Sequence, residues 1–268
     1  MKNKPEKFEF EPIGYVRCGQ NYRYEAPRQA VFADNEGCIE LLSGHNYEQA
    51  ARDLTGFDRI WVIFMFHLNE GWRPLVQPPV APPGRKVSLF ATRAPYRPNP
   101  IGMSCVELVK VEGRVLHIRN FDLLDGSPVL DIKPYIPHAD AFPDSAAGWL
   151  EEAQGERYEV KIEPHALKMM QWIKAESGLD LENFALLQLG INPLASKRKR
   201  ISIAPDDPEQ LEIGCRTWRI GFKAYPAPHI IDVQYVRTNY TPEELLPASD
   251  DKYKDKELHR NFCEKKFV

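Results

Sequence analysis

The apolar residues in the first half of the chain occur in short stretches separated by turn-forming residues, and this pattern limits the possible folds most strongly. The longest unbroken apolar run, Ile60–Phe66, is too short to cross a bilayer and suits a strand buried on both faces. Ile13–Arg17 and Val87–Thr92 are further strand candidates, and Glu112-Gly113 separates two more as the turn of a hairpin. Many short strands predict a barrel or a sandwich over residues 8–133.

One helix and two stiff loops interrupt these strands. Asn46 and Gln49 occupy the positions of a capping box, so we expect Asn46 to cap a helix over Tyr47–Leu54. Prolines cluster in Pro74–Pro83 and Pro95–Pro100. Because proline fixes φ and donates no backbone hydrogen bond, these segments are either simple extended connections or preorganised binding loops.

The sequence changes in character near residue 150. Apolar periodicity predicts two helices followed by two strand-like segments, over His165–Ser177, Leu181–Leu189, Glu212–Tyr225 and His229–Arg237. Pro164 opens the first helix, Gly178 ends it, and Asp180 is placed to cap the second. Trp218, Ile220, Phe222 and Ala224 alternate with polar residues, as a strand with one buried face requires.

These patterns predict a fold that is mainly β with an α+β appendage. We expect a β-rich domain over residues 8–150 and a small C-terminal α+β domain over residues 155–240. Residues 241–268 are rich in charges of both signs, which predicts a poorly ordered tail.

Several classes of protein lack support in the sequence. The net charge of −3 means that any nucleic-acid site has to be a local patch. The five cysteines form no C-x-x-C pair and the seven histidines show no metal-ligand spacing, which predicts a protein without a metal site or a disulfide framework. No G-x-G fingerprint, P-loop or G-x-S-x-G elbow occurs. The charged N-terminus has no apolar signal segment, so we expect a cytoplasmic protein outside any membrane.

Four polar segments follow or end the predicted strands and carry the chemistry of the β-rich half. They are residues 26–29 (APRQ), 66–68 (FHL), 91–102 (ATRAPYRPNPIG) and 122–135 (DLLDGSPVLDIKPY). Carboxylates and carbonyls accept hydrogen bonds from ammonium and hydroxyl groups, and arginine pairs with carboxylate. The segments therefore suit a cofactor with an amino-acid end and an adenosine end, without specifying it.

These segments also make residues 8–143 similar to the TsaA/YaeB-like (TrmO-like) family, which is associated with N6-methylation of adenosine 37 in tRNA. The matching stretches are APRQ (26–29), GFDRIWVIFMFH (56–67), GWRPLVQPP (71–79), LFATRAPYRPNPIGMSCVEL (89–108) and DLLDGSPVLDIKPYIPHAD (122–140). The resemblance implies a single-sheet β-barrel that binds S-adenosylmethionine. It further implies a homodimer with the cofactor site near the subunit interface, and threonylcarbamoyl-adenosine 37 of tRNA as the substrate.

The resemblance also implies roles for individual residues. The implied cofactor-binding residues are Ala26, Pro27, Arg28, His67, Leu68, Arg93, Asp122, Leu123, Leu124 and Asp125. The implied catalytic residues are Tyr96, Asp131 and Lys133. The implied RNA contacts are Arg97 and the basic run Lys197, Arg198, Lys199 and Arg200.

Most of these roles have a structural alternative. Arg28 suits a surface turn, His67 suits a strand end, and Asp131 with Lys133 suits an ion pair. The base that removes the N6 proton is left open among Asp131, Asp122 and Tyr96. A basic run is also commonly a solvated face.

Bacterial relatives often carry Asp-Pro-Arg-Pro-Ala-Tyr where this chain has Asn192-Pro193-Leu194-Ala195-Ser196-Lys197. This difference leaves two other functions open. One is methylation of another RNA or of a small molecule, and the other is a non-catalytic module that binds the cofactor or RNA.

Overall fold

The computed structural model shows a chain that divides into two compact units. It describes residues 7–27, 30, 33–78, 80–81, 84–152, 157–190, 193–194, 200–205, 207–247 and 249–267. The first unit comprises Met1–Pro78 and Lys86–Ala146, and the second comprises Pro79–Arg85 and Ala147–Val268. We call them the barrel unit and the second unit. Within the described ranges, no helix is both long enough and apolar enough to cross a membrane.

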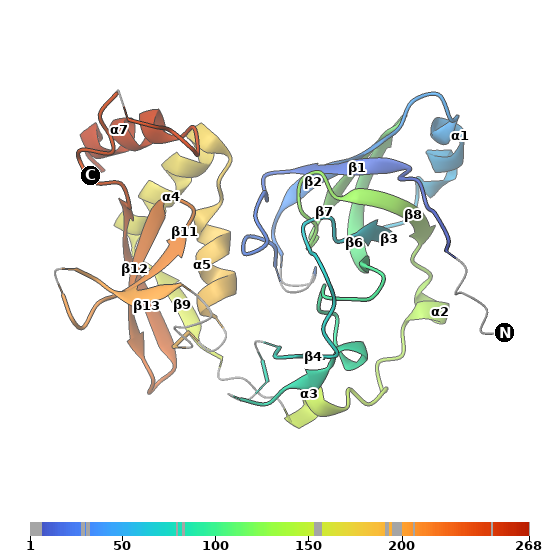
Figure 1. Cartoon of the computed structure of the whole chain (residues 1–268), viewed down its shortest axis with the longest axis horizontal. Helices are drawn as coiled ribbons and strands as arrows, with labels where there is room; N and C mark the ends of the chain where they lie inside the picture. The colour runs from blue at the N-terminus through green and yellow to red at the C-terminus, as the bar shows by residue number, and fades with distance from the viewer. Residues whose placement is uncertain are drawn as a thin grey trace. The chain divides into compact units, whose positions relative to one another are not determined.

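The barrel unit is built from a single sheet that closes on itself in the strand order β1-β2-β7-β6-β3-β8 (Figure 1). Its strands are β1 (Gly14–Cys18), β2 (Glu36–Leu41), β3 (Arg59–Met65), β6 (Ile101–Glu112), β7 (Val115–Arg119) and β8 (Pro128–Pro134). All six neighbouring pairs are antiparallel. The prediction of a mainly β fold with a single-sheet barrel is therefore confirmed.

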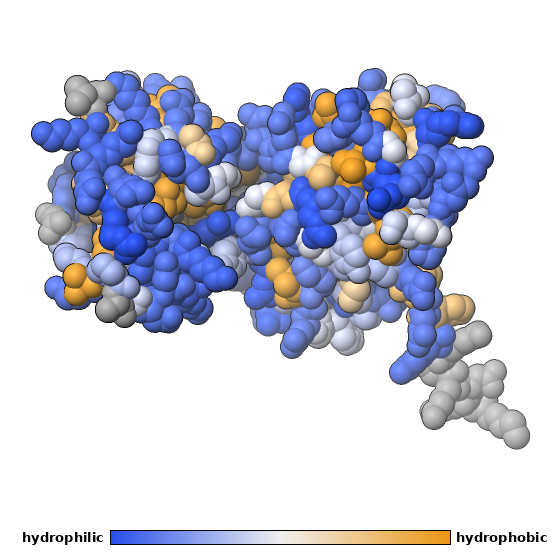
Figure 2. Space-filling view, turned by 90° about the horizontal axis from the view of Figure 1, so that it is seen from above, coloured by the Kyte–Doolittle hydropathy of each residue, from blue (hydrophilic) through white to orange (hydrophobic). Residues whose placement is uncertain are grey.

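The core of the barrel comes from alternate residues of its strands. In β3, Ile60, Val62 and Phe64 are buried inside, whereas Trp61 and Ile63 are only half-buried. The expectation that this strand is buried on both faces is wrong, because a strand of a closed barrel has only one face toward the core. Apolar side chains consequently reach the outside, and small groups of them interrupt the mostly hydrophilic surface seen in Figure 2.

The connections of the barrel unit are short and irregular. They contain α1 (Tyr47–Ala51), η2 (Arg52–Leu54), β4 (Leu75–Val76), β5 (Val87–Ser88), η3 (Leu89–Ala91) and α2 (Pro137–Asp140). Asn46 does not cap α1 as expected. Its φ of 57° lies in the left-handed region and its side chain accepts no backbone N–H; its amide donates to Gln49 Oε1 at 2.7 Å instead.

The second unit has a five-stranded sheet in the order β10-β11-β12-β13-β9. Its strands are β9 (Glu159–Ile162), β10 (Ile201–Ile203), β11 (Leu211–Cys215), β12 (Trp218–Tyr225) and β13 (Ile230–Thr238), and its first three helices are α3 (Trp149–Glu152), α4 (Pro164–Ser177) and α5 (Leu181–Leu189). The Asp180 cap is confirmed, since its side chain accepts the Asn183 N–H at 2.9 Å. The predicted strand Glu212–Tyr225 is instead the hairpin β11–β12, because Arg216 turns the chain with a φ of 49°.

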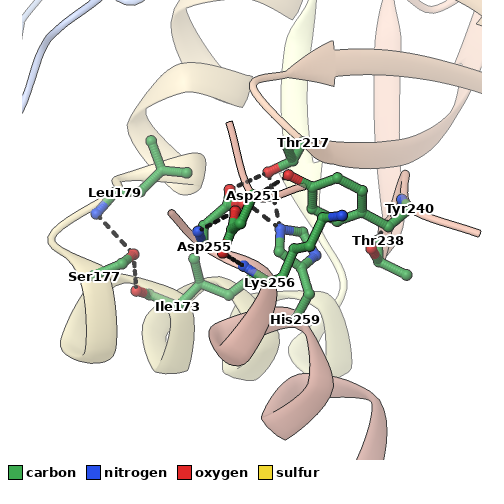
Figure 3. Close-up of polar contacts among 10 residues, drawn as sticks. All are labelled: Ile173, Ser177, Leu179, Thr217, Thr238, Tyr240, Asp251, Asp255, Lys256 and His259. Carbon is green, nitrogen blue, oxygen red and sulfur yellow. Dashed lines mark hydrogen bonds and ion pairs between the residues drawn. The ribbon is translucent and has the colours of Figure 1, made fainter. Parts of the chain in front are cut away.

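The charged C-terminal segment is not the poorly ordered tail that its composition suggested. Lys256–Glu264 forms helix α7, in which His259 and Phe262 are buried. Figure 3 shows the polar contacts that hold it: Thr217 Oγ1 donates to Asp255 Oδ2 at 2.5 Å and lies 2.8 Å from His259 Nε2. The sequence hid this packing because one narrow apolar face of α7 is surrounded by charges.

Candidate cofactor-binding and RNA-binding site

The segment between β7 and β8 carries Asp122 and Asp125, which the barrel holds in different ways. The Ser104 hydroxyl of β6 donates a hydrogen bond to Asp122 Oδ1. Burial raises the pKa of Asp122, while the Ser104 hydrogen bond and the positive charge of Arg93 oppose that rise. The structure thus places Arg93 where its charge acts on Asp122.

Asp125 is anchored to the end of β1 by the backbone. Its Oδ1 accepts the Cys18 N–H at 3.0 Å, and its own N–H donates to the Gln20 carbonyl at 2.8 Å. The next residue, Gly126, has a φ of 71° and donates to the Val16 carbonyl at 2.9 Å. These contacts fix the Asp122–Gly126 segment, including Leu123 and Leu124, at one end of the barrel.

The end of β3 meets this segment. His67 Nε2 lies 4.0 Å from the point where a β carbon on Gly126 would sit. Leu68 is 43% exposed, and the following residue, Asn69, has a buried side-chain nitrogen without a hydrogen-bond partner in the described part of the chain. A buried amide donor without a partner is costly, so this position is suited to a polar ligand atom.

The loop that carries Ala26 and Pro27 is attached to the same segment. The Asn35 side chain accepts the Phe121 N–H at 2.9 Å and donates to Gln20 Oε1 at 2.9 Å. Ala26 is half-buried and Pro27 is buried. The implied cofactor residue Arg28 lies outside the described residues.

The proline-rich loop after η3 is contacted by two arginines, Arg97 within the loop and Arg73 from an earlier connection. Arg97 Nη1 donates to the carbonyls of Thr92 and Ala94, at 3.0 and 3.3 Å, so part of this guanidinium is engaged within the loop. The Arg73 guanidinium carbon lies 4.8 Å from the centre of the Tyr96 ring. A cation–π contact of this kind helps to hold the ring in place, and Tyr96 is half-buried.

Asp131 and Lys133 do not join these loops. Lys133 Nζ lies 2.7 Å from Asp131 Oδ2, and Ile132 between them packs against the barrel core. The two charged side chains therefore stand on the outer face of β8, paired with each other. This arrangement corresponds to the structural ion pair that the sequence left open.

Of the basic run, Lys197, Arg198 and Lys199 lie outside the described residues. Arg200 is exposed just before β10, in the second unit.

Sequence reasoning missed Ser104 and Asn69. Ser104 is 5% exposed and occupies an inward position of β6, where apolar residues alternate toward the core. A polar residue at an inward strand position is a signal that could have identified it. Asn69 gave no comparable signal, since it is one polar residue in a polar loop.

The set of groups fits S-adenosylmethionine. Carboxylates of Asp122 and Asp125 can accept from ammonium or hydroxyl groups, and the unpartnered Asn69 amide can donate. Among the described residues, no three His, Cys, Asp or Glu side chains gather as a metal site would require.

Comparisons with known proteins identify the family. Residues 15–141 match the family model described as the tRNA-methyltransferase O N-terminal domain. The chain is 37% identical over 170 residues to the tRNA (adenine(37)-N6)-methyltransferase of Escherichia coli (strain K12), covering 61% of this chain and 72% of that protein. It is 40% identical over 144 residues to a probable S-adenosyl-L-methionine-binding protein of Pyrococcus abyssi, covering 53% and 76% of the two chains. The crystal structure of TrmO from Pseudomonas aeruginosa superposes with a TM-score of 0.63 at 27% identity, covering 87% of this chain and 99% of that one.

The closed barrel and its strand-end loops place the chain in a class of barrel-fold proteins, distinct from the Rossmann-fold proteins. The relatives define the family within that class. The chain belongs to the tRNA-methyltransferase O family.

Proposed function

We propose that this protein transfers the methyl group of S-adenosylmethionine to N6 of (threonylcarbamoyl)adenosine 37 in tRNA. Family membership supports the enzyme class, the cofactor and the tRNA substrate. The observation that carries the proposal is the convergence of His67 and the Asp122–Gly126 segment at one end of the barrel. The barrel unit then carries the chemistry, and the second unit contributes to holding the RNA.

The bound cofactor supplies an electrophilic methyl carbon on a sulfonium. We expect Asp125, Arg93 and Asn69 to bind its polar groups, and we expect Tyr96 to stack on the adenine of the target nucleoside. Asp122 is the best base for the N6 proton, because burial raises the pKa of its carboxyl and makes the carboxylate more basic. Position 37 lies in a single-stranded loop, so little unpairing energy is needed to present the base.

A homodimer is part of the proposal, and the outer face of the barrel supports it. Met65 pairs with Ile101 and Ile63 with Met103 across β3 and β6. Met65 and Ile101 are each 40% exposed, and Met103 is 55% exposed. Contiguous exposed apolar side chains of this kind mark interaction surfaces, and a two-fold contact would bury the same patch on both copies. Light scattering should give the dimer mass at micromolar concentration, and Met103→Lys should shift it toward the monomer.

The site is proposed to act without a metal and, because tRNA is its substrate, in the cytoplasm. Calorimetry with a chelator present should show one S-adenosylmethionine site per chain. Loss of the binding heat on adding the chelator would overturn the metal-free assignment.

The decisive experiment is transfer of labelled methyl groups to bulk tRNA, followed by nucleoside analysis. The expected product is the N6-methylated form of threonylcarbamoyl-adenosine. Label in another nucleoside would show a different RNA target. Cofactor binding without transfer to any tRNA would show a non-catalytic module.

A further inference from the structure

The outer face of the second unit's sheet gathers three arginines. Trp218, Ile220 and Phe222 of β12 point into the core, so the residues between them belong to the opposite face. On that face, the strand register places Arg219 opposite Gly214 on one side and opposite Arg237 on the other.

The third arginine, Arg200, lies beside the same row. Its Cβ is 3.9 Å from the point where a β carbon on Gly214 would sit. The guanidinium of Arg219 is placed against Gly214 as well, so Arg200 and Arg219 both border this glycine.

One carboxylate lies among these charges, and Arg237 engages both of its oxygens. Glu212 is 1% exposed, and Arg237 donates to its Oε1 and Oε2 at 2.6 Å each, while the Tyr235 hydroxyl donates to Oε1 at 2.9 Å. No carboxylate of the described residues forms an ion pair with Arg219. Among the described residues around Arg219, the positive charges of Arg219 and Arg237 therefore face one carboxylate, that of Glu212.

The like charges of Arg219 and Arg237 on neighbouring strands are unfavourable unless an anion approaches. Like charges directly opposite each other on neighbouring strands destabilise a sheet. Burial lowers the pKa of Arg219, Glu212 opposes that change, and the charges of Arg237 and Arg200 lower it further. The chain as a whole is acidic, with a net charge of −3, so this pairing of like positive charges is a local feature of the face.

Two glycines make the surface flat. A β carbon on Gly214 would overlap the Arg219 guanidinium, and one on Gly221 would overlap the Tyr235 ring. Arg219 and Tyr235 therefore lie along the sheet rather than standing away from it. A flat, positively charged face admits an extended polymer more readily than a closed pocket would.

The next row of the sheet shows that the charge is confined. Lys223 stands opposite Asp232 in β13, and its Nζ lies 3.7 Å from Asp207 Oδ2. That lysine is balanced by acidic neighbours, so the unbalanced charge lies in the row of Arg219.

We infer that the face formed by Arg200, Arg219 and Arg237 binds a phosphate group of the RNA backbone. The inference rests on the proposed function, since it gives the tRNA substrate a second contact outside the barrel. Guanidinium groups match phosphate in planar, two-point geometry, which favours arginine over lysine at such a position. Free inorganic phosphate has the same chemistry, so the experiment has to separate the two.

The test compares three variants of the full-length protein by tRNA binding at several salt concentrations. Arg219→Gln should weaken binding roughly tenfold, the scale of one charge-assisted hydrogen bond. It should lower the log–log salt slope by roughly 0.7–0.9. Arg219→Lys should restore the slope but only part of the affinity. Lys223→Gln, on the same strand and face but balanced by acids, is the matched control and should change neither. Arg237 is unsuited to the test, because removing it would leave Glu212 buried without its partner.

The outcomes separate this site from the proposed function. An unchanged affinity and slope in Arg219→Gln, with methyl transfer intact, would overturn the phosphate site and leave the function standing. A weaker tRNA complex in Arg219→Gln, with no methyl transfer to tRNA by the parent protein, would keep the site and overturn the function. Inorganic phosphate that binds the parent but not Arg219→Gln, without any change in tRNA binding, would assign the site to free phosphate and overturn the RNA inference.

Discussion

The two units hold their polar groups in different ways. In the barrel unit, Asp122 and Asp125 lie in a loop whose backbone is tied to β1, whereas in the second unit Arg219 and Arg237 stand on neighbouring strands. Polar side chains in a loop can converge on one binding position, because each of them is fixed by its own hydrogen bonds. Polar side chains on neighbouring strands instead repeat at the spacing of the sheet, which is about 4.8 Å between strands.

This difference indicates a division of labour. A methyl transfer needs a few atoms in strict alignment, worth up to roughly 7–11 kcal/mol in model reactions. Binding an RNA backbone needs spaced positive charge and tolerates small displacements. A loop-built site suits the first task and a strand-built row suits the second.

The largest expected effect is on the chemistry of the barrel. Asp122→Asn should lower kcat by roughly 10²–10⁴-fold, because the base for the N6 proton is lost. Single-turnover methyl transfer measures this. Asp131→Asn is the matched control, since this carboxylate is paired with Lys133 on the outer face, and it should retain kcat within a few-fold. A larger loss of kcat in Asp131→Asn than in Asp122→Asn would instead identify Asp131 as the catalytic base.

The next effect concerns the stability of the second unit alone. Arg237→Leu leaves the buried carboxylate of Glu212 without its partner, which we expect to cost about 2–3 kcal/mol. This is below the full penalty for a buried pair because the Arg237 side chain is 39% exposed. Thermal unfolding should show an earlier transition, while S-adenosylmethionine binding by the barrel persists below it. A simultaneous loss of cofactor binding would show that the two units do not unfold separately.

A smaller effect is expected in the pH dependence of the barrel site. Because the pKa of Asp122 is raised, kcat should fall as pH drops through a value above that of an ordinary aspartate. The Ser104 hydrogen bond stabilises the ionised carboxylate, so Ser104→Ala should raise this pKa further and move the acidic limb to higher pH. A pH–rate profile of both proteins measures the shift. A limb that moves to lower pH would contradict the assignment of Asp122 as the base.

The smallest expected effects are on stability, and they concern the residue that precedes one helix in each unit. Asp180→Ala should destabilise the second unit by about 1 kcal/mol, because the side chain that accepts the Asn183 N–H is lost. Asn46→Gly should change the stability of the barrel unit by only a few tenths of a kcal/mol, since Asn46 makes no capping bond and glycine tolerates its positive φ. Chemical denaturation resolves the difference. Equal losses for both variants would mean that Asn46 caps α1 after all.

Structural features that depend only on residues close together in the sequence could be predicted from it. The hairpin at Glu112-Gly113 follows from a glycine with a φ of 59° between two alternating stretches. The helices α4 and α5 follow from apolar periodicity bounded by Pro164, Gly178 and Asp180. Strand β9 was missed because its alternation of polar and apolar residues covers only four positions, and because it pairs in parallel with β13, far along the chain.

The same limit on prediction, between contacts that are local in the sequence and contacts that are distant in it, applies to the candidate site. The segments that carry the polar groups could be found in the sequence, because strand ends and prolines mark them and the family resemblance names them. Three contacts became visible in the folded chain alone: Ser104 meets Asp122, Asp131 turns outward to Lys133, and Arg219 faces Arg237. These contacts depend on strand register, because a shift of one residue moves every side chain of a strand to the other face, and register is set by pairing across the sheet.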